Sequence, residues 1–281
     1  MKILLTGSSG FIGSHYYNHT KNNNQVTPVD LVDGIDLCDY HDFEDQDVVV
    51  HMAATNGTKL FYDIPTDVSF NNTLPTFNLI KRFRGTSTKF VFTSTCEIFN
   101  DTISDGHYSI PTDENVPVMF KDITNSRWSY SLPKALGENL VANSDLDYLI
   151  IRYFNIYGPR QKDHFITEFV ERCKNGEYYI NGNDTRSFCY IDDAVNMTHE
   201  LVKNHSGYTV NVGRNQEHTI EEVALIIMEL MGIKDKLEIR PGRKGSATRR
   251  CPNTDLIYKL TGFNNYTPLR VGMEKTLEDL L

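Results

Sequence analysis

The sequence predicts an α/β fold, a doubly wound parallel sheet with a second, smaller lobe. Short apolar runs alternate with segments of helical period over most of the chain, and a glycine-rich turn directly follows the first apolar run. Strands that alternate with helices in this way form parallel sheets with helices on both faces. The last third of the chain has more loops and prolines, and this change indicates the second lobe.

The apolar runs give the expected strands in order. Residues 3–5 form the first strand, and after the glycine turn a helix runs through Tyr17. The other expected strands are residues 26–29, 48–51, 89–93, 148–152 and 208–212, and the expected helices between them are residues 72–82, 133–142 and 192–203. In the last third, residues 219–231 have the pattern of an amphipathic helix, with an apolar stripe of Val223, Ile226, Ile227 and Leu230.

We therefore divide the chain into two units. Residues 1–153, completed by about residues 186–212, form the sheet domain, and residues 154–185 with 213–281 form the smaller lobe. The division is discontinuous because residues 208–212 have the pattern of a strand that returns to the main sheet. We expect the face of the smaller lobe to close over a ligand.

Composition and charge exclude several classes of protein. The 281 residues carry a net charge of -9, whereas general nucleic-acid binding needs clustered Lys and Arg. No apolar run has the length of a membrane span, and three consecutive apolar residues near the N-terminus are too few for a signal peptide. Five cysteines without a C-x-x-C pair favour reduced thiols and indicate no metal site. We expect a soluble, cytoplasmic protein in which the basic residues 240–250 can meet phosphates locally.

The glycine turn predicts a dinucleotide site. Gly7, Gly10 and Gly13 fall at a G-x-x-G-x-x-G spacing between the first strand and its helix. Glycine permits the tight turn and the close approach of a pyrophosphate, whose charge the helix N-terminus favours. Asp30 ends the second strand, where its carboxylate would accept hydrogen bonds from the adenosine ribose and repel a 2′-phosphate. The pattern therefore favours NAD over NADP.

A Y-x-x-x-K pair predicts a catalytic base. The spacing places Tyr130 and Lys134 on one face of a helix. A free tyrosine has a pKa of about 10, and a lysine ammonium together with the positive nicotinamide of NAD⁺ should lower that pKa. Pro133 lies between them and fits only if the helix begins close to Tyr130, with Ser129 or Ser131 as its cap.

Several segments in order carry a resemblance to a known family: residues 6–13, 36–37, 51–54, 72, 93–99, 130–134, 152–160, 185–193 and 249–252. The chain resembles the extended short-chain dehydrogenases/reductases, a Rossmann-fold family that includes UDP-galactose 4-epimerase, nucleotide-sugar 4,6-dehydratases and UDP-glucuronate decarboxylases. The resemblance extends over nearly the whole chain. It implies an enzyme that binds NAD in the sheet domain and a nucleotide-diphosphate sugar in the smaller lobe.

The resemblance also implies roles for individual residues. Thr95 corresponds to the family's catalytic Ser or Thr, which shares a hydrogen bond with the sugar O4 and the tyrosine. Asn155 matches a position that binds the substrate diphosphate, and Arg186 and Arg250 match phosphate-binding arginines. The implied cofactor-binding residues are Phe11 and Ile12 at the pyrophosphate, Asp36 and Leu37 beside the adenine, Ala53 and Ala54 along the middle, Asn72 as a brace of the loops, Thr93, Tyr130, Lys134 at the nicotinamide ribose, and Phe154 at the nicotinamide face.

Two departures from the family pattern bear on the reaction. Asp30 and His51 are only 21 positions apart, so the usual second helix and following strand must be abbreviated, as in the dTDP-4-dehydrorhamnose reductases. Glu97 stands where simple 4-epimerases have a small, non-acidic residue and where dehydratases and decarboxylases have Glu. Cys96 replaces the Asp that precedes this Glu in dehydratases of the dTDP-glucose type.

The expected function is a nucleotide-sugar epimerase that works through a 4-keto sugar, with Tyr130, Lys134 and Thr95 as catalytic residues. A 4,6-dehydratase or a decarboxylase of the UDP-glucuronate type, both of which would use Glu97, are the alternatives. A keto-sugar reductase and a non-catalytic NAD-binding regulator also stay open. By analogy with the family, we expect a homodimer formed through residues 72–82 and 133–142.

Overall fold

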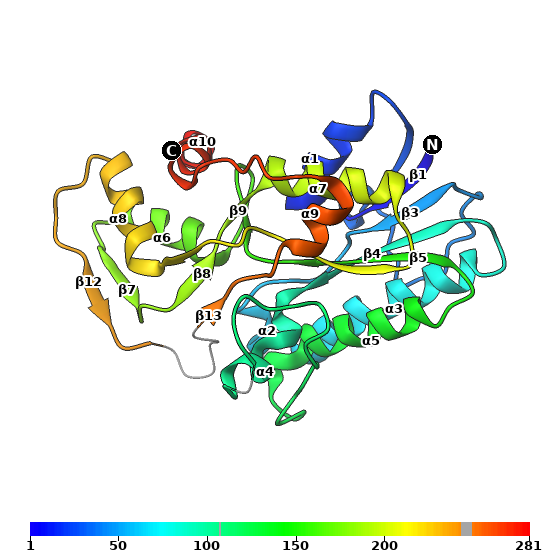
Figure 1. Ribbon diagram of the computed structural model, residues 1–281, viewed down its shortest axis with the longest axis horizontal. Helices are drawn as coiled ribbons and strands as arrows, with labels where there is room; N and C mark the ends of the chain where they lie inside the picture. The colour runs from blue at the N-terminus through cyan, green and yellow to red at the C-terminus, as the bar shows by residue number, and fades with distance from the viewer. Residues whose placement is uncertain (107, 243–248) are drawn as a thin grey trace.

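The protein is described by a computed structural model that covers residues 1–106, 108–242 and 249–281. Its centre is a six-stranded sheet with the order β2-β1-β3-β4-β5-β10, and neighbouring strands are parallel throughout (Figure 1). The strands are β1 (Lys2–Thr6), β2 (Gln25–Val29), β3 (Val48–His51), β4 (Lys89–Thr95), β5 (Asp147–Tyr153) and β10 (Tyr208–Val212). The predicted α/β fold is confirmed, including the return of the last of these strands to the main sheet.

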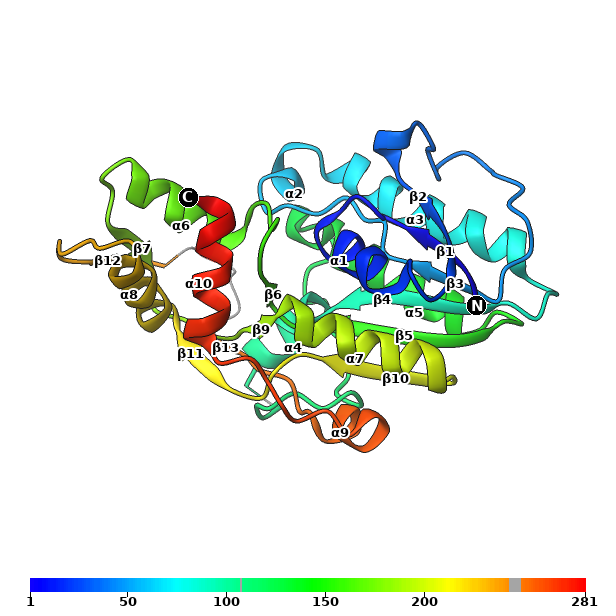
Figure 2. The ribbon, with the colours of Figure 1, turned by 90° about the horizontal axis from the view of Figure 1, so that it is seen from above.

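Helices cover both faces of this sheet (Figure 2). One face packs against α1 (Phe11–Thr20) and α7 (Ile191–Asn204), and the other packs against α3 (Pro65–Phe83) and α5 (Ser131–Ala142). Alternate residues of β1 show the division: Ile3 and Leu5 belong to the first core, and Leu4 belongs to the second. Apolar side chains on both faces of the strands are typical of a buried parallel sheet.

The connection between β2 and β3 is short, as predicted from the 21 positions between Asp30 and His51. It holds the single 3-10 turn η1 (Leu31–Asp33) where a helix would usually lie, and no further strand follows before β3. β2 is therefore an edge strand, and most of its side chains are at least partly exposed. Pro28 is tolerated within β2 because an edge strand can lack one N–H donor.

The helix that carries the predicted base begins where Pro133 requires. Tyr130 occupies the N-cap position of α5, so Pro133 falls in the first turn, where its missing N–H costs nothing. The expected serine cap is wrong, because no side chain caps this helix and the hydroxyls of Ser129 and Ser131 are buried without a partner. The helix expected from residue 72 begins earlier, at Pro65.

The remaining elements form the smaller lobe and the connections around it. Two helices in it, α6 (His164–Lys174) and α8 (Ile220–Leu230), pack against each other, and α8 also packs against a sheet of β7 (Tyr179–Asn181) and β12 (Glu238–Arg240) (Figures 1 and 2). The other elements are α2 (Leu60–Asp63), η2 (Cys96–Phe99), α4 (Asn100–Ser104), η3 (Ser126–Ser129), β6 (Ile156–Tyr157), β8 (Thr185–Ser187), β9 (Cys189–Tyr190), β11 (Glu217–Thr219), β13 (Arg249–Arg250), α9 (Asp255–Thr261) and α10 (Leu269–Leu280). The predicted amphipathic helix is confirmed as α8, which a capping box of Thr219 and Glu222 starts.

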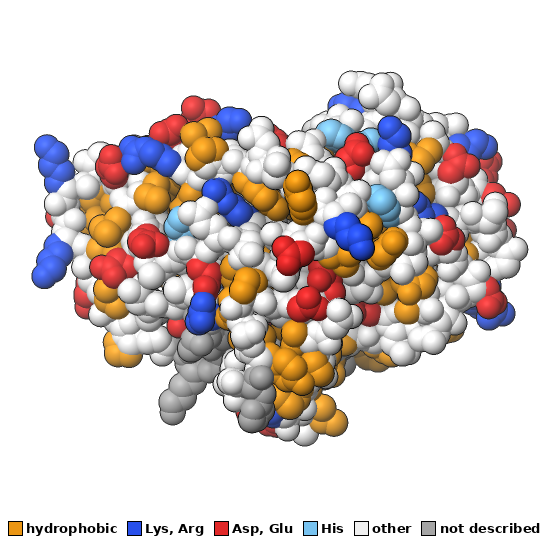
Figure 3. All heavy atoms as spheres, viewed as in Figure 1, with side chains coloured by type: hydrophobic (Ala, Val, Ile, Leu, Met, Phe, Trp, Pro, Cys, Tyr) orange, Lys and Arg blue, Asp and Glu red, His pale blue; other side chains and the backbone are white. Residues whose placement is uncertain are grey.

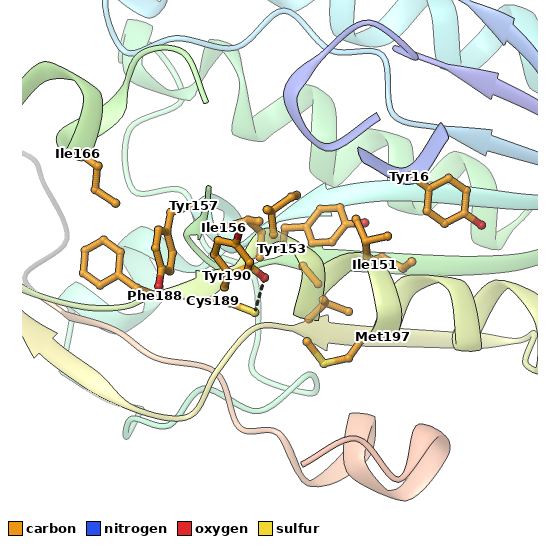
Figure 4. Close-up of a cluster of buried hydrophobic side chains, with 14 of the residues drawn as sticks. Tyr16, Ile151, Tyr153, Ile156, Tyr157, Ile166, Phe188, Cys189, Tyr190 and Met197 are labelled. Carbon is orange, nitrogen blue, oxygen red and sulfur yellow. Dashed lines mark hydrogen bonds between the residues drawn. The ribbon is translucent and has the colours of Figure 1, made fainter. Parts of the chain in front are cut away.

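One hydrophobic cluster runs from the sheet into the smaller lobe (Figure 4). It contains Ile151 and Tyr153 of β5, Tyr190 of β9 and Ile166 of α6. Part of the last third also returns to the sheet domain, because α9 packs against α7 and β10. The two parts therefore share a core. In the described part of the chain, no helix is both long and apolar enough to span a membrane.

Candidate active site

A cleft of about 1020 Å³ lies between the carboxyl ends of the parallel strands and the smaller lobe. Open parallel sheets bind ligands at this edge. The structure brings most of the predicted site residues to this cleft: Gly7, Gly10, Phe11, Ile12, Gly13, Ala54, Thr93, Thr95, Glu97, Tyr130, Lys134, Asn155, Arg186 and Arg250 line it. It does not bring Asp30, Asp36, Leu37, Ala53, Asn72 and Phe154 to the lining.

The glycine turn has the shape that a pyrophosphate needs. A Cβ at Gly13 would lie 2.0 Å from the Gly7 carbonyl oxygen, and a Cβ at Gly7 would lie 2.6 Å from the Ala53 nitrogen. α1 begins at Phe11 with no side-chain cap and no acidic residue in its first turn. Its first N–H groups and the positive end of its dipole are therefore left for an anion, and the turn fits the diphosphate of NAD.

Asp30 lies beside this turn, at the end of β2. Its carboxylate accepts the Ser9 N–H at 2.9 Å, so the predicted ribose-binding group is fixed to the cradle itself. Asp36 turns its carboxylate to the Cys38 N–H at 2.8 Å, and Leu37 is buried in the core on the α3 side of the sheet. The adenine contacts of Asp36 and Leu37 stay predictions.

Asn72 holds the loop that follows β3. Its Nδ2 donates to the Thr55 carbonyl at 2.9 Å and to the Val68 carbonyl at 2.7 Å. The Ala53 N–H, at the start of the same loop, donates to the Thr6 hydroxyl at 3.2 Å. These bonds fit the predicted bracing role of Asn72, and they fix the wall of the cleft from behind.

Tyr130 lies at the start of α5 and is 8% exposed. Thr93 and Thr95 reach the same part of the cleft from the end of β4. The Thr95 hydroxyl accepts the Glu97 N–H at 3.2 Å and thereby caps η2. On its ring face, Tyr130 stacks with Phe61 of α2, with 5.5 Å between the ring centroids and 10° between the ring planes.

The expected lowering of the Tyr130 pKa is not produced by the chain's own side chains. Burial raises the pKa of Tyr130 above its usual value of 10, and the nearby Glu97 adds to the rise. Burial also lowers the pKa of Lys134 to about 7. In the protein without cofactor the loss of solvation of both groups therefore outweighs the charge of Lys134, and a lowered Tyr130 pKa beside bound NAD⁺ stays a prediction.

Glu97 is held by two guanidinium groups inside the cleft. Its carboxylate lies 2.5 Å from Arg250 and 3.3 Å from Arg127, and the Asn100 amide donates to it at 2.5 Å. Burial raises the pKa of Glu97, but the two arginines and Asn100 outweigh burial, so its pKa lies below the ordinary value. Glu97 is therefore an ionised, anchored carboxylate.

The residues predicted to bind the substrate lie around this ion pair. Asn155 has a left-handed backbone with φ of 42°, and its buried Nδ2 has no hydrogen-bond partner. Arg186 lies 3.4 Å from the Asp184 carboxylate, and burial together with Arg250 lowers the pKa of Arg186 to about 10. Phe154 is buried against Phe99, with ring centroids 6.3 Å apart, so its contact with a nicotinamide stays a prediction.

Sequence reasoning assigned no role to Arg127 and Phe61, which also line the cleft. Arg127 comes from η3, three residues before Tyr130, and Phe61 comes from the short helix α2, between β3 and α3. Arg127 precedes the Y-x-x-x-K pair by three residues, and this position is a sequence signal that could have indicated it. Phe61 carries no such signal, because only the folded loop brings it to Tyr130. Of the basic stretch 240–250, residues 243–248 lie outside the described residues.

Comparison with known proteins agrees with this geometry. The model of the NAD dependent epimerase/dehydratase family matches residues 3–213. The chain is 28% identical to UDP-N-acetyl-alpha-D-glucosaminuronate decarboxylase of Bacillus cytotoxicus, over 99% of this chain and 97% of the relative. It is 24% identical to UDP-glucuronic acid decarboxylase 1 of Danio rerio, over 99% of this chain and 72% of that one.

The fold also matches solved structures. A crystal structure of UDP-galactose 4-epimerase superimposes with a TM-score of 0.85 at 28% identity, covering 100% of this chain and 98% of that one. The family match, the glycine cradle and the Tyr130–Lys134 pair at one cleft agree with each other. The chain therefore belongs to the NAD-dependent epimerase/dehydratase family and is an NAD-dependent enzyme.

Proposed function

We propose that this enzyme decarboxylates a nucleotide-linked uronate sugar through a 4-keto intermediate. The observation that supports this reaction most directly is the Glu97 carboxylate held by Arg127 and Arg250 in the cleft that contains Tyr130. The two decarboxylases similar over nearly the whole of this chain support the same choice. UDP-galactose 4-epimerase, at 28% identity, keeps 4-epimerisation as the second candidate.

The first step would use Tyr130 and Thr95. Tyr130 takes the proton of the sugar O4 while C4 is oxidised to a ketone, and Thr95 orients that hydroxyl. NAD⁺, when bound, accepts the two electrons removed from C4 and returns them at the end of the reaction, and its positive charge favours ionisation of the phenol. The Lys134 amine would hold the nicotinamide ribose from the same helix face.

The second step distinguishes the candidate reactions. In a 4-keto uronate the carboxylate is β to the ketone, so the C5–C6 bond can break with its electron pair moving to the C4 oxygen, and CO₂ leaves without any base at C5. C5 then takes a proton and C4 is reduced again. Arg127 and Arg250 carry two positive charges against the one negative charge of Glu97, so the group keeps a net positive charge that suits a sugar with a C6 carboxylate. Guanidinium groups pair with carboxylates in a fork.

The same groups fit the rival reactions less well. Removal of the C5 proton in 4,6-dehydration needs a base, and the anchored Glu97, with its lowered pKa, is a weak one. Epimerisation at C4 needs a group that takes and returns one proton, and Tyr130 alone supplies it. 4-Epimerisation would not use the Glu97 carboxylate or its partners Arg127 and Arg250.

Substrate binding would rest on the polar side of the cleft. The buried Asn155 amide, which lacks a partner for its Nδ2, and the Arg186 guanidinium are donors suited to a diphosphate. General nucleic-acid binding is not proposed, because acidic and basic side chains are interspersed over the face shown in Figure 3.

Incubation of the purified enzyme with a panel of UDP-, GDP- and dTDP-linked sugars tests the proposal. Mass spectrometry should detect loss of CO₂ from a nucleotide-linked uronate, with no net change in NAD⁺. A product of unchanged mass would favour 4-epimerisation, and loss of water would favour dehydration. Net consumption of NADH would indicate a reductase, and cofactor binding without any product would indicate a regulator.

A matched pair of variants sharpens this experiment. Arg127→Gln removes one cation from the cleft, and Arg127→Lys keeps the charge but loses the fork geometry. If the cation binds the uronate carboxylate, KM for the uronate should rise by about tenfold or more in the Gln variant and less in the Lys variant. An equal effect of both variants on uronate and neutral nucleotide sugars would contradict the role.

We also propose a cytoplasmic homodimer. Phe70, Leu74 and Phe77 of α3 and Leu136 of α5 are exposed on the helix pair expected to form the interface. This apolar stripe supports association with a second copy through the same two helices. All five cysteines are free thiols, which supports a reducing compartment.

A further inference from the structure

We propose that Phe61 is a positioning residue for Tyr130, whose phenol its ring holds in place and shields from water. The inference rests on the proposed role of Tyr130 as the base but not on decarboxylation. Decarboxylation, 4-epimerisation and 4,6-dehydration would all begin when Tyr130 takes the proton of the sugar O4.

The contact between the two rings is close and nearly parallel. Their centroids lie 5.5 Å apart and their planes differ by 10°. Phe61 is 4% exposed, although it lines the cleft. With Val68 and Tyr130 it forms a small buried cluster, separate from the two cores that flank the sheet. Phe61 therefore covers part of one face of the phenol ring and forms part of the wall beside it.

The loop after β3 holds Phe61 in this position. The Phe61 N–H donates to the Gly57 carbonyl at 3.3 Å, and the Ile64 N–H donates to the Leu60 carbonyl at 3.0 Å. Asn72 fixes the start of the segment through the Thr55 carbonyl. These bonds fix the backbone of the short helix α2, and burial among Val68 and Tyr130 restricts the Phe61 side chain.

Two consequences follow for the phenol. A stacked neighbour restricts movement of the Tyr130 side chain about its Cα–Cβ bond, so the hydroxyl stays directed to the reacting position near Thr95. The same neighbour removes water from the phenol, which disfavours the phenolate. The other ionisable groups around Tyr130 are Glu97 and Cys96 of η2 and Lys134 of α5, whose Nζ lies 5.8 Å from the ring centroid.

Fluorine NMR of protein labelled with fluorotyrosine tests the shielding directly. The Tyr130 resonance is assigned by its loss in Tyr130→Phe, and its shift between H₂O and D₂O reports contact with solvent. We expect almost no such shift in the wild type and a clear one in Phe61→Ala. Phe61→Leu keeps most of the apolar volume and should give a small solvent-dependent shift. It replaces the Ala variant in this measurement if Phe61→Ala does not fold.

The holoenzyme gives the second measurement. Loss of the ring should reduce kcat by about tenfold while KM changes by less than about twofold, because the base is misplaced but the substrate site is intact. Water admitted to the phenol lowers its pKa, so the rise of kcat with pH should move to lower pH by about 1 unit in Phe61→Ala. Phe61→Tyr, which restores a stacked ring, should recover most of kcat.

Val68→Ala is the matched control. It removes apolar volume from the same cluster, so it should lower Tm without changing the solvent shift or the pH profile. A Phe61→Ala protein with the wild-type solvent shift, kcat and pH profile would overturn the inference. If the wild type turns over no sugar, the proposed function fails, and the NMR measurement still tests Phe61.

Discussion

The Lys134 ammonium donates its hydrogen bond to the Thr93 carbonyl oxygen at 2.8 Å, at the end of β4, and its Nζ also lies 4.9 Å from the centroid of the Phe92 ring. The amine is thus tied to the sheet that forms the floor of the cleft. Burial lowers its pKa to about 7, against the opposing influence of Glu138. Lys134 therefore changes charge near neutral pH in the protein alone, and its charge depends on what binds beside it.

Replacement of Tyr130 by Phe should abolish turnover and spare the cofactor. Loss of the phenol removes the acid–base group, so kcat should fall by about a thousandfold. NAD⁺ affinity, measured by isothermal titration calorimetry, should stay within about twofold, since the stacked ring is kept. Lys134→Met should lower both kcat and NAD⁺ affinity, because it also removes the proposed contact with the nicotinamide ribose. Retained activity in Tyr130→Phe would overturn the assignment of the base.

Gly13→Ala should destroy the cofactor site. The added Cβ would lie 2.0 Å from the Gly7 carbonyl oxygen, so the turn must move. We expect NAD⁺ affinity to fall by at least about a hundredfold. Gly176→Ala is the control: Gly176 has a φ of +76° but open space around it, so that variant should lose about 1 kcal/mol of stability and keep NAD⁺ binding. Equal NAD⁺ affinity in both variants would show that the glycine turn does not bind the diphosphate of NAD.

His51 should make the protein sensitive to acid. It is buried on β3 between the hydroxyls of Thr6 and Thr76, and burial lowers its pKa from 6.5 to about 3. The unfolded chain takes up this proton below pH 6.5 and the folded chain does so only near pH 3. The stability from this group is thus complete above pH 6.5 and falls as pH decreases, by about 3 kcal/mol at pH 4.

Urea unfolding of His51→Gln between pH 7 and pH 4 tests this assignment. The variant should be less stable at pH 7 but should lose less stability on acidification than the wild type does. His19→Gln, at an exposed histidine of α1, is the control and should follow the wild type. The same acid dependence in His51→Gln as in the wild type would show that other groups cause it.

Phe77→Glu should convert the proposed dimer into a monomer. Phe77 is 51% exposed on α3, and a charge at the centre of an apolar interface leaves it buried and unpaired. Sedimentation velocity should show the mass of one chain for this variant and of two chains for the wild type. Tyr258→Glu, at a 55% exposed residue of α9, should sediment as the wild type does. A wild-type protein that is itself monomeric would refute the interface.

The sequence allowed most of the sheet to be predicted because most of its strands contain continuous apolar runs, as in residues 48–50, that can be recognised without tertiary information. The glycine turn and the Tyr130–Lys134 pair were predictable for a similar reason, since each depends on local spacing. The rise in the Tyr130 pKa in the protein without cofactor was not predictable, because it depends on burial in the folded chain and on Glu97, which comes from another element. The Glu97–Arg250 ion pair joins residues 153 positions apart, and only the folded chain shows it.

The return of the chain to the sheet at β10 limits how this protein can be divided. The chain leaves the sheet after Tyr153, returns for α7 and β10, and leaves again, while one apolar cluster spans both parts. A fragment that stops at Tyr153 would lack β10, the neighbour of β5. It would expose β5 as an unpaired edge strand that can associate with other chains. Exchange of the smaller lobe for that of a relative would therefore require replacement of two separate segments, 154–185 and 213–281, with three junctions in all and a matching set of side chains beneath them.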